Sequence, residues 1–539
     1  MRAELLALLV VTGWGSAGSA QEEHRHSEPS RSLGRVAFPN SGAPAAQAPF
    51  LQGIALLHSF EYDDAADAFR AAERADSTFA LAYWEEALTY SKLLWGLDDV
   101  PGARSALARL APTPAARLAL ARTARERDYG AAVEAFYADT NVSRRSLAYA
   151  DSMRHLVQRY PTDPEAAAFA SIALLMAANS ADLQPGQDTL FRNEAIALAT
   201  RVFQANPRHP GAAHYLIHAY DDPAIAARGL AFARAYARIA PDAEHALHMP
   251  SHIFLQVGQW DDVVHSNEQA WAASRAAAAR HGDSVAQLDF HALEWLQYGY
   301  LEQGRAAAAR SLIDTAETVL RGADLAGDPD MRFAVADLTF AYAAGTGRWE
   351  ITSALRAPPA PPADASGRER SFTRIAAFQA AYASAMRGDT AGAMAGIRAF
   401  QQILASLPAG APNRPRILFL TAQLEAAVAD RRGDHARAAE LLGRWADFDN
   451  QSSPVGPPWY PPVGEQLGNA LLAAGRPHEA AAAYEGALSA RANRSEALAG
   501  IAIARRRAGD VAQAAAARRK LVANWHAADP EVRRRIPAP

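Results

Sequence analysis

Five of the chain's histidines lie close together in the sequence, at spacings that can bind a metal ion. The chain has 16 histidines in 539 residues, and His214, His218, His245, His248 and His252 fall within one short stretch. Residues four apart share a face of an α-helix, so each HxxxH pair presents two imidazoles to one side. Neutral imidazole binds Zn, Cu and Ni. The spacing predicts a divalent transition-metal site with His214, His218, His248 and His252 as its principal ligands.

The two histidine pairs are related by a sequence repeat. His214 and His248 are 34 residues apart, and so are His218 and His252. The same interval recurs near the C-terminus, within residues 464–527. Both pairs are therefore expected at the same position of two successive structural units.

Helices must position these residues. Helix-forming Ala, Leu and Arg dominate the repeats, Gly475 and Gly509 mark turns, and Pro207 and Pro241 each follow a predicted helix. No segment shows convincing strand alternation. The 34-residue helical hairpin resembles the tetratricopeptide repeat. We predict an all-α protein, a right-handed α-solenoid of stacked tetratricopeptide-like hairpins.

Longer phrases extend the resemblance. The segments LHSFEYDDAADAFRAA, HPGAAHYLIHAYDDP and HALHMPSHIFLQVGQW are similar to a group of bacterial exported tetratricopeptide proteins whose function is unassigned. The similarity covers residues 50–320 and 452–525. In this family, positions 2, 5, 9, 12 and 13 of each first helix usually face a concave groove, which implies that the five histidines face one too.

The next hairpin adds candidate ligands. Aligning Gly304 with Gly258 places His291, Glu294 and Tyr298 at the groove-facing positions. Glu294 is therefore predicted as an added metal ligand. His291 is predicted as an auxiliary residue.

Two other hypotheses explain the same residues. A small molecule or a peptide carboxylate could be bound by His245, His291, Tyr298 and Asp222, with Asp222 at the rim of the groove. Alternatively, the histidines form hydrogen bonds between helices and fix the packing of neighbouring hairpins.

Pro250 interrupts the second histidine pair. Proline removes a backbone donor and clashes with the preceding turn. Residues 245–249 are therefore expected to form a separate turn, with the main helix beginning near Pro250, or else the helix tolerates a kink. A separate turn would aim His245 and His248 differently from His252.

Catalytic motifs are missing from the sequence. HMPSH lacks the Glu of HExxH, and neither a phosphate-binding loop nor GxGxxG after a strand occurs. The absence of Cys excludes a thiol nucleophile. No catalytic residue is predicted, and a metal-dependent hydrolase or oxidase using the same histidines is the alternative function.

Charge and hydropathy limit the partners. With 54 basic and 58 acidic residues the net charge is -4, which does not favour nucleic-acid binding. The apolar run Leu5 to Val11 is too short to span a bilayer and is typical of a secretory signal ending near Ala20. We expect a periplasmic or secreted protein without stable membrane insertion, which binds a protein or peptide in its groove.

The chain is expected to be divided by proline-rich segments. The predicted parts are a signal peptide 1–20, a disordered leader 21–45, an N-terminal solenoid 46–356, a linker 357–370, hairpins 371–451, a proline-rich connection 452–463, a C-terminal repeat pair 464–527 and a tail 528–539.

Overall fold

A computed structural model shows two compact units, one ending at Ile253 and the other beginning at Phe254. The structure describes residues 31–92, 94, 97–180, 182–282, 288–322, 329–361, 367–451 and 455–538. The signal segment expected at 1–20 lies outside the described residues. The boundary between the units falls inside the block 46–356 that the repeat pattern treats as one solenoid. Among the described residues, no helix is both long and apolar enough to cross a membrane.

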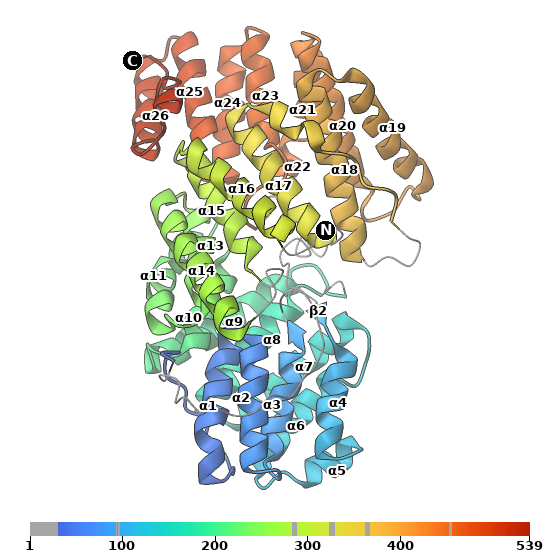
Figure 1. Cartoon of the computed structure of the whole chain (residues 1–539), viewed down its shortest axis with the longest axis vertical. Coiled ribbons are helices and arrows are strands. Elements are labelled where there is room, and N and C mark those ends of the chain that lie inside the picture. Colours follow the sequence, from blue (N-terminus) through green and yellow to red (C-terminus); the bar gives the residue numbers. More distant parts are fainter. Residues whose placement is uncertain are drawn as a thin grey trace. The chain divides into compact units, whose positions relative to one another are not determined.

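The N-terminal unit is a series of helices in which most pack against the next (Figure 1). Its elements are α1 (Pro44–His58), α2 (Tyr62–Ala75), α3 (Ala80–Thr89), β1 (Ser91–Lys92), β2 (Leu97–Asp98), α4 (Val100–Leu110), α5 (Pro114–Ala119), α6 (Ala124–Phe136), α7 (Val142–Arg159), α8 (Pro164–Ala177), α9 (Gln187–Ala205), α10 (Pro210–Tyr220), η2 (Ala226–Gly229), α11 (Leu230–Ile239), α12 (Glu244–His248) and α13 (Pro250–Gln256), which crosses the boundary. The two strands form a two-residue antiparallel ladder.

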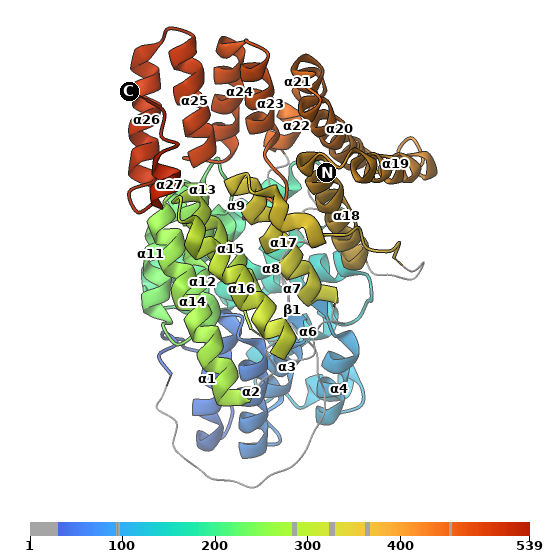
Figure 2. The same cartoon turned by 45° about the horizontal axis from the view of Figure 1, so that its top comes forward.

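The C-terminal unit is built in the same way, and its last hairpins are seen most clearly in Figure 2. Its elements are α14 (Trp260–His281), α15 (Phe290–Glu302), α16 (Ala306–Gly322), α17 (Pro329–Thr346), η5 (Trp349–Ala354), α18 (Gly367–Arg387), α19 (Thr390–Ser406), α20 (Arg414–Arg431), α21 (His435–Gly443), α22 (Ala446–Gln451), α23 (Val463–Ala473), α24 (Pro477–Ala490), α25 (Ser495–Arg507), α26 (Val511–Asn524) and α27 (Pro530–Arg533). The all-α solenoid of stacked helical hairpins is confirmed.

Local sequence signals account for the helix boundaries. Gly475 and Gly509 adopt left-handed φ angles of 74° and 84° in the turns between α23 and α24 and between α25 and α26, a conformation that glycine adopts without steric cost. Pro207 and Pro241 follow the ends of α9 and α11, because proline cannot continue a helix.

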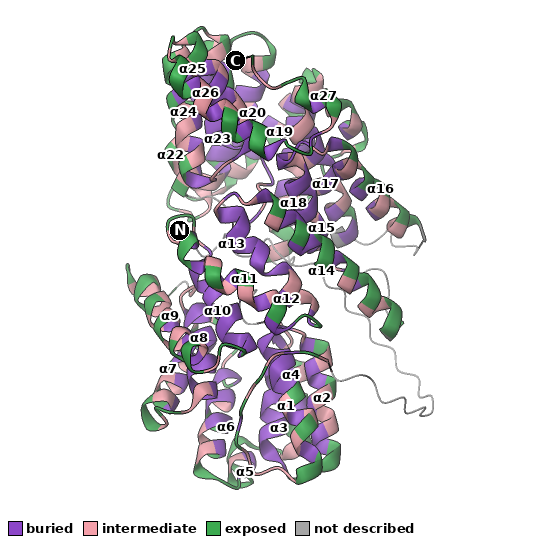
Figure 3. Ribbon diagram, turned by 90° about the vertical axis from the view of Figure 1, so that its left-hand side faces the viewer, coloured by how far each residue is buried: buried purple, intermediate pink, exposed green. Residues whose placement is uncertain are grey.

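Two helices form the centre of the N-terminal unit. In α8, every residue from Glu165 to Ala177 is buried, and α10 is buried along most of its length. Figure 3 shows both helices mainly in the colour of buried residues, whereas α9 carries a largely exposed face. A helix that is buried on all sides can place polar side chains away from water.

The second half of the expected leader is ordered. Residues 31–43 form neither helix nor strand, and two of their backbone N–H groups bond to distant residues: Arg35 donates to the carbonyl of Arg208 and Ala37 to Glu165 Oε1. Phe38 is buried and packs against Tyr129. The disorder expected up to residue 45 is therefore not observed here, because these contacts with residues far along the chain fix the segment.

The proline-rich connection 452–463 contributes to the core where it is described, from residue 455. Trp459 and Tyr460 are buried, and the Tyr460 hydroxyl donates to Asp449 Oδ1 at 2.7 Å. Gln379 Nε2 donates to the Trp459 carbonyl at 3.1 Å. The aromatic residues of this segment anchor it within the C-terminal unit.

Candidate metal centre

Three helices carry the five clustered histidines, and His252 lies on α13. His214 and His218 lie on α10, while His245 and His248 lie on the short helix α12. Helix α12 ends at His248 and α13 begins at Pro250, so the separate turn that the proline suggested is present. This break lets α12 take its own direction.

His214 is held in one tautomer by the backbone. Its Nδ1 lies 2.7 Å from the carbonyl oxygen of His58, and a carbonyl only accepts hydrogen bonds. Nδ1 therefore carries the proton, and Nε2 presents a lone pair. His58 is the last residue of α1, where helix carbonyls lack an intrahelical partner and the helix dipole is negative. This environment makes His214 Nε2 a stronger electron-pair donor.

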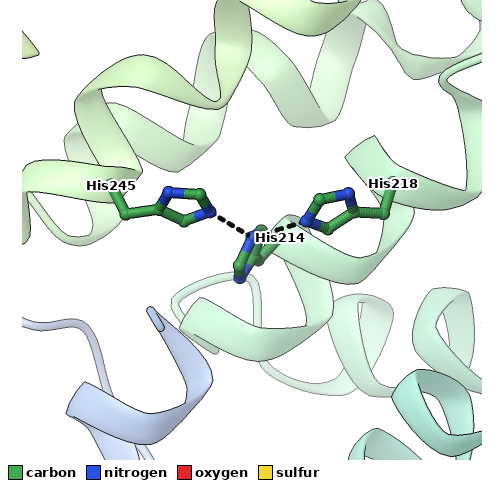
Figure 4. A group of neighbouring side chains, drawn as sticks. All are labelled: His214, His218 and His245. Carbon is green, nitrogen blue, oxygen red and sulfur yellow. Dashed lines mark hydrogen bonds between the residues drawn. The ribbon is translucent and has the colours of Figure 1, made fainter. Parts of the chain in front are cut away.

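Two more imidazoles approach that lone pair. His218 Nε2 lies 3.0 Å from His214 Nε2, and His245 Nε2 lies 3.2 Å from the same atom. Figure 4 shows the His218 ring of α10 and the His245 ring of α12 each directing a nitrogen at the His214 ring, from opposite sides. All three atoms lie within 4.8 Å of one another. The structure thus brings together two of the four principal ligands predicted from sequence, and His245 completes the group.

Burial keeps these rings neutral. It lowers the pKa of His214 to about 3, although the bond to the His58 carbonyl opposes the shift. Burial, followed by the neighbouring imidazoles, lowers the pKa of His218 and of His245 well below the ordinary value. At neutral pH the group therefore consists of three uncharged imidazoles, the protonation state that binds metal ions.

Aromatic rings enclose the three histidines. The Phe60 ring lies 4.3 Å from His214, 5.7 Å from His218 and 5.4 Å from His245, measured between ring centroids. Tyr236 stacks on His214 at 5.1 Å. Phe60 has a left-handed φ of 60°, which is uncommon for a residue that is not glycine. Such backbone conformations often occur at functional sites.

The second HxxxH pair forms a group of its own. His248 Nε2 lies 3.1 Å from His252 Nε2, and His252 Nδ1 lies 2.7 Å from Asp221 Oδ2. Asp221 is buried. Its neighbour Asp222, predicted as a ligand-binding residue, instead accepts a bond from the Ala224 backbone N–H at 2.9 Å.

A third buried group supports the first and was not found from sequence. Glu165 Oε2 lies 2.8 Å from His58 Nε2, and Glu165 Oε1 lies 3.3 Å from His209 Nε2. Burial alone would raise the pKa of Glu165, but the two imidazoles outweigh it and hold that pKa well below the usual range. The Tyr215 hydroxyl bonds to His58 Nδ1 at 2.8 Å.

The sequence offered only a weak signal for this group. His58 and His209 fall in phrases that also carry the family resemblance. Nothing in the local spacing connects them, because Glu165 is 107 residues from His58.

The remaining predicted ligands lie in the C-terminal unit, on α15. His291 packs against Trp295. Burial, followed by the charges of Asp337 and Asp289, raises the pKa of Glu294 well above its usual value. The Tyr298 hydroxyl bonds to Arg494, and the Tyr298 ring packs on Trp260. The histidine centre described above is built from the N-terminal unit alone.

Comparisons with known proteins give low similarities. No family model matches the chain, and no curated protein matches it. Among solved structures, the human IFIT1 dimer with m7Gppp-AAAA is 13% identical, with a TM-score of 0.36 over 84% of this chain and 90% of that one. Yeast Tom70 is 10% identical, with a TM-score of 0.34 over 89% of this chain and 91% of that one. The P58(IPK) TPR domain is 13% identical, with a TM-score of 0.20 over 86% and 98%. At these values the similarities carry no argument for what this chain binds.

Proposed function

We propose that the N-terminal unit binds one divalent transition metal ion, Zn, Cu or Ni, through His214, His218 and His245. The observation that carries the proposal is the convergence of three Nε2 atoms in which the His214 lone pair is fixed by the His58 carbonyl. A helical-repeat scaffold of this kind suggests protein or ligand binding, and the metal gives that binding a specific centre.

The distances fit one ion. With metal–nitrogen bonds of about 2.05 Å and tetrahedral angles, two ligand nitrogens are separated by about 3.3 Å. His214 Nε2 lies 3.0 Å from His218 Nε2 and 3.2 Å from His245 Nε2. The nitrogens of His218 and His245 lie within 4.8 Å of each other, so a bound metal would draw these two rings together.

Without a metal the three rings do not satisfy one another well. A neutral imidazole has one N–H donor and one acceptor nitrogen. His218 and His245 both approach the single lone pair of His214, which accepts only one strong hydrogen bond. A bound cation replaces this competition with three donor–metal bonds.

Metal titration of the full chain tests the proposal. Protein prepared without an affinity tag and stripped with a chelator is titrated with Zn, Ni and Cu by calorimetry. We expect tight binding in the wild type, and at least a hundredfold weaker binding at this centre in His218→Phe, which keeps an aromatic ring without ligand nitrogens. His155→Ala, which changes an exposed histidine of the same unit, is the matched control and should bind like the wild type.

Two results would overturn the proposed metal site. If the stripped wild type takes up none of the three metals, the histidines serve only to pack helices. The same conclusion follows if His218→Phe has the circular dichroism spectrum of a folded protein and binds metal as tightly as the wild type.

A metal-dependent hydrolase or oxidase is the second candidate. Three histidine ligands leave a coordination position open, and catalytic zinc sites use this arrangement to activate water. A peptide or small-molecule carboxylate could occupy the same position, which joins the metal-binding and ligand-binding hypotheses. Metal-loaded protein is assayed for ester and peptide hydrolysis and for oxygen consumption. Activity that His218→Phe also retains would not belong to this centre.

We also propose export to the periplasm or the medium. The N-terminal sequence supports it, with its short apolar run and small residues up to Ala20. Intact-mass measurement after bacterial expression should show a chain beginning near Gln21. A cytoplasmic full-length chain would refute export.

A further inference from the structure

The second histidine pair repeats the main geometric feature of the first. His248 and His252 are one 34-residue repeat after His214 and His218. The Nε2 atoms of the second pair lie 3.1 Å apart, compared with 3.0 Å in the first. Both separations are close to the ~3.3 Å between two ligands of one tetrahedral ion.

An acceptor orients one ring in each pair. In the first pair the His58 carbonyl holds the Nδ1 proton of His214. In the second, the Asp221 carboxylate lies 2.7 Å from His252 Nδ1. A histidine that donates from Nδ1 to a carboxylate has its Nε2 available and more basic, as in carboxylate–histidine–zinc triads.

Burial and charge also suit a cation here. His248, His252 and Asp221 are all buried, so water solvates none of them fully. A cation bound by uncharged imidazoles in such a place needs a nearby anion. Asp221, whose side chain is only 5% exposed, provides that charge within the same group.

From this geometry we propose that His248 and His252, oriented by Asp221, form a second position for a divalent transition metal, next to the first. Ring centroids of the two groups lie 6.1 Å apart between His218 and His252 and 6.2 Å apart between His245 and His248. The N-terminal unit then holds a pair of metal ions. This inference rests on the metal-binding function proposed above.

Copper titration followed by electron paramagnetic resonance tests the second position. Stripped full-length protein is titrated with Cu(II) alone, in buffer containing glycine to compete for weak surface sites. We expect the wild type to bind two equivalents. The second equivalent should broaden the spectrum of the first and produce a half-field signal, because the two ions lie close together.

Matched variants assign the two positions. His218→Phe removes a ligand of the first group and His248→Phe a ligand of the second, and each should reduce binding to one equivalent and abolish the half-field signal. Asp221→Asn keeps an acceptor for His252 but removes the charge, and should weaken only the second equivalent, by about 10- to 100-fold.

The outcomes separate the two proposals. A wild type that saturates at one equivalent, lost in His218→Phe and kept in His248→Phe, overturns the second position and leaves the first. A His248→Phe protein that still binds two equivalents also overturns it. If the wild type binds no copper, nickel or zinc, both proposals fail. Should His248→Phe not fold, the wild-type stoichiometry and Asp221→Asn still decide.

Discussion

Lowering the pH should destabilise the metal-free N-terminal unit in a way that depends on His214. Burial lowers the pKa of this imidazole from 6.5 to about 3 in the folded chain. The unfolded chain therefore binds a proton below pH 6.5 that the folded chain binds only near pH 3. Because the unfolded state holds more protons in this window, the free energy of unfolding rises with pH and falls on acidification.

The size of the effect follows from the two pKa values. At pH 5 the unfolded imidazole is almost fully protonated and the folded one is almost fully neutral. Each unit of pH below 6.5 removes ~1.4 kcal/mol, so His214 alone lowers the free energy of unfolding by about 2 kcal/mol between pH 7.5 and pH 5. His218 and His245, whose pKa values are also lowered, act in the same direction.

Hydrogen exchange measured by mass spectrometry can locate this loss. Peptides covering 209–222 report the opening of α10 in the full chain, after correction for the intrinsic exchange rate at each pH, with a chelator present. In His214→Phe the part of the pH dependence due to this ring should vanish. His155→Ala, an exposed histidine on α7, should keep the wild-type dependence.

Two results would refute the reasoning. One is an opening free energy for α10 that stays constant, or increases, from pH 7.5 to pH 5. The other is a His214→Phe protein whose pH dependence equals that of the wild type. Either result would mean that the folded chain does not lower the pKa of this imidazole.

Three further predictions concern the surroundings of the centre. Gly211→Ala would place a Cβ 2.5 Å from His58 Nδ1, so we expect thermal denaturation to show a free energy of unfolding lower by about 1–3 kcal/mol. Gly443→Ala is the control, because nothing lies within 4 Å of its Cβ, and it should leave the free energy of unfolding unreduced. Tyr215→Phe removes the hydroxyl that bonds to His58 Nδ1 and should lower the free energy of unfolding of the N-terminal unit, measured in urea, by about 1–3 kcal/mol. An unchanged urea midpoint would contradict that bond. Metal at a hundred times its dissociation constant should stabilise the wild type by about 2.7 kcal/mol, seen as a higher melting temperature that His218→Phe does not share.

Helical spacing and the 34-residue repeat allowed part of the histidine arrangement to be predicted from the sequence. The interval of four residues placed His214 and His218 on one face of α10, and the interval of 34 related the two pairs, although His248 and His252 lie on the separate helices α12 and α13. The break before Pro250 also followed from the chemistry of proline. These features are local, so a short stretch of sequence contains all that determines them.

The division of the ligands into groups could not be predicted in this way. All five histidines were expected along one groove, but His245 on α12 joins the α10 pair, while His248 and His252 associate with Asp221. Which rings share a group depends on how α12 packs after the break. A helical wheel gives the face of a residue but not the direction of the next helix.

The proposed function of His214 as a metal ligand depends on a residue far away in the sequence. His58 precedes it by 156 positions, and it contributes through its backbone carbonyl at the end of α1. Any residue type has that carbonyl, so no motif could reveal it. Its position is fixed by the His58 ring, which bonds to Glu165 and Tyr215. A metal centre in a helical repeat therefore needs two kinds of information: repeating side chains that supply nitrogens, and unique long-range contacts that fix their tautomers. The repeat provides the first, and only the folded unit provides the second.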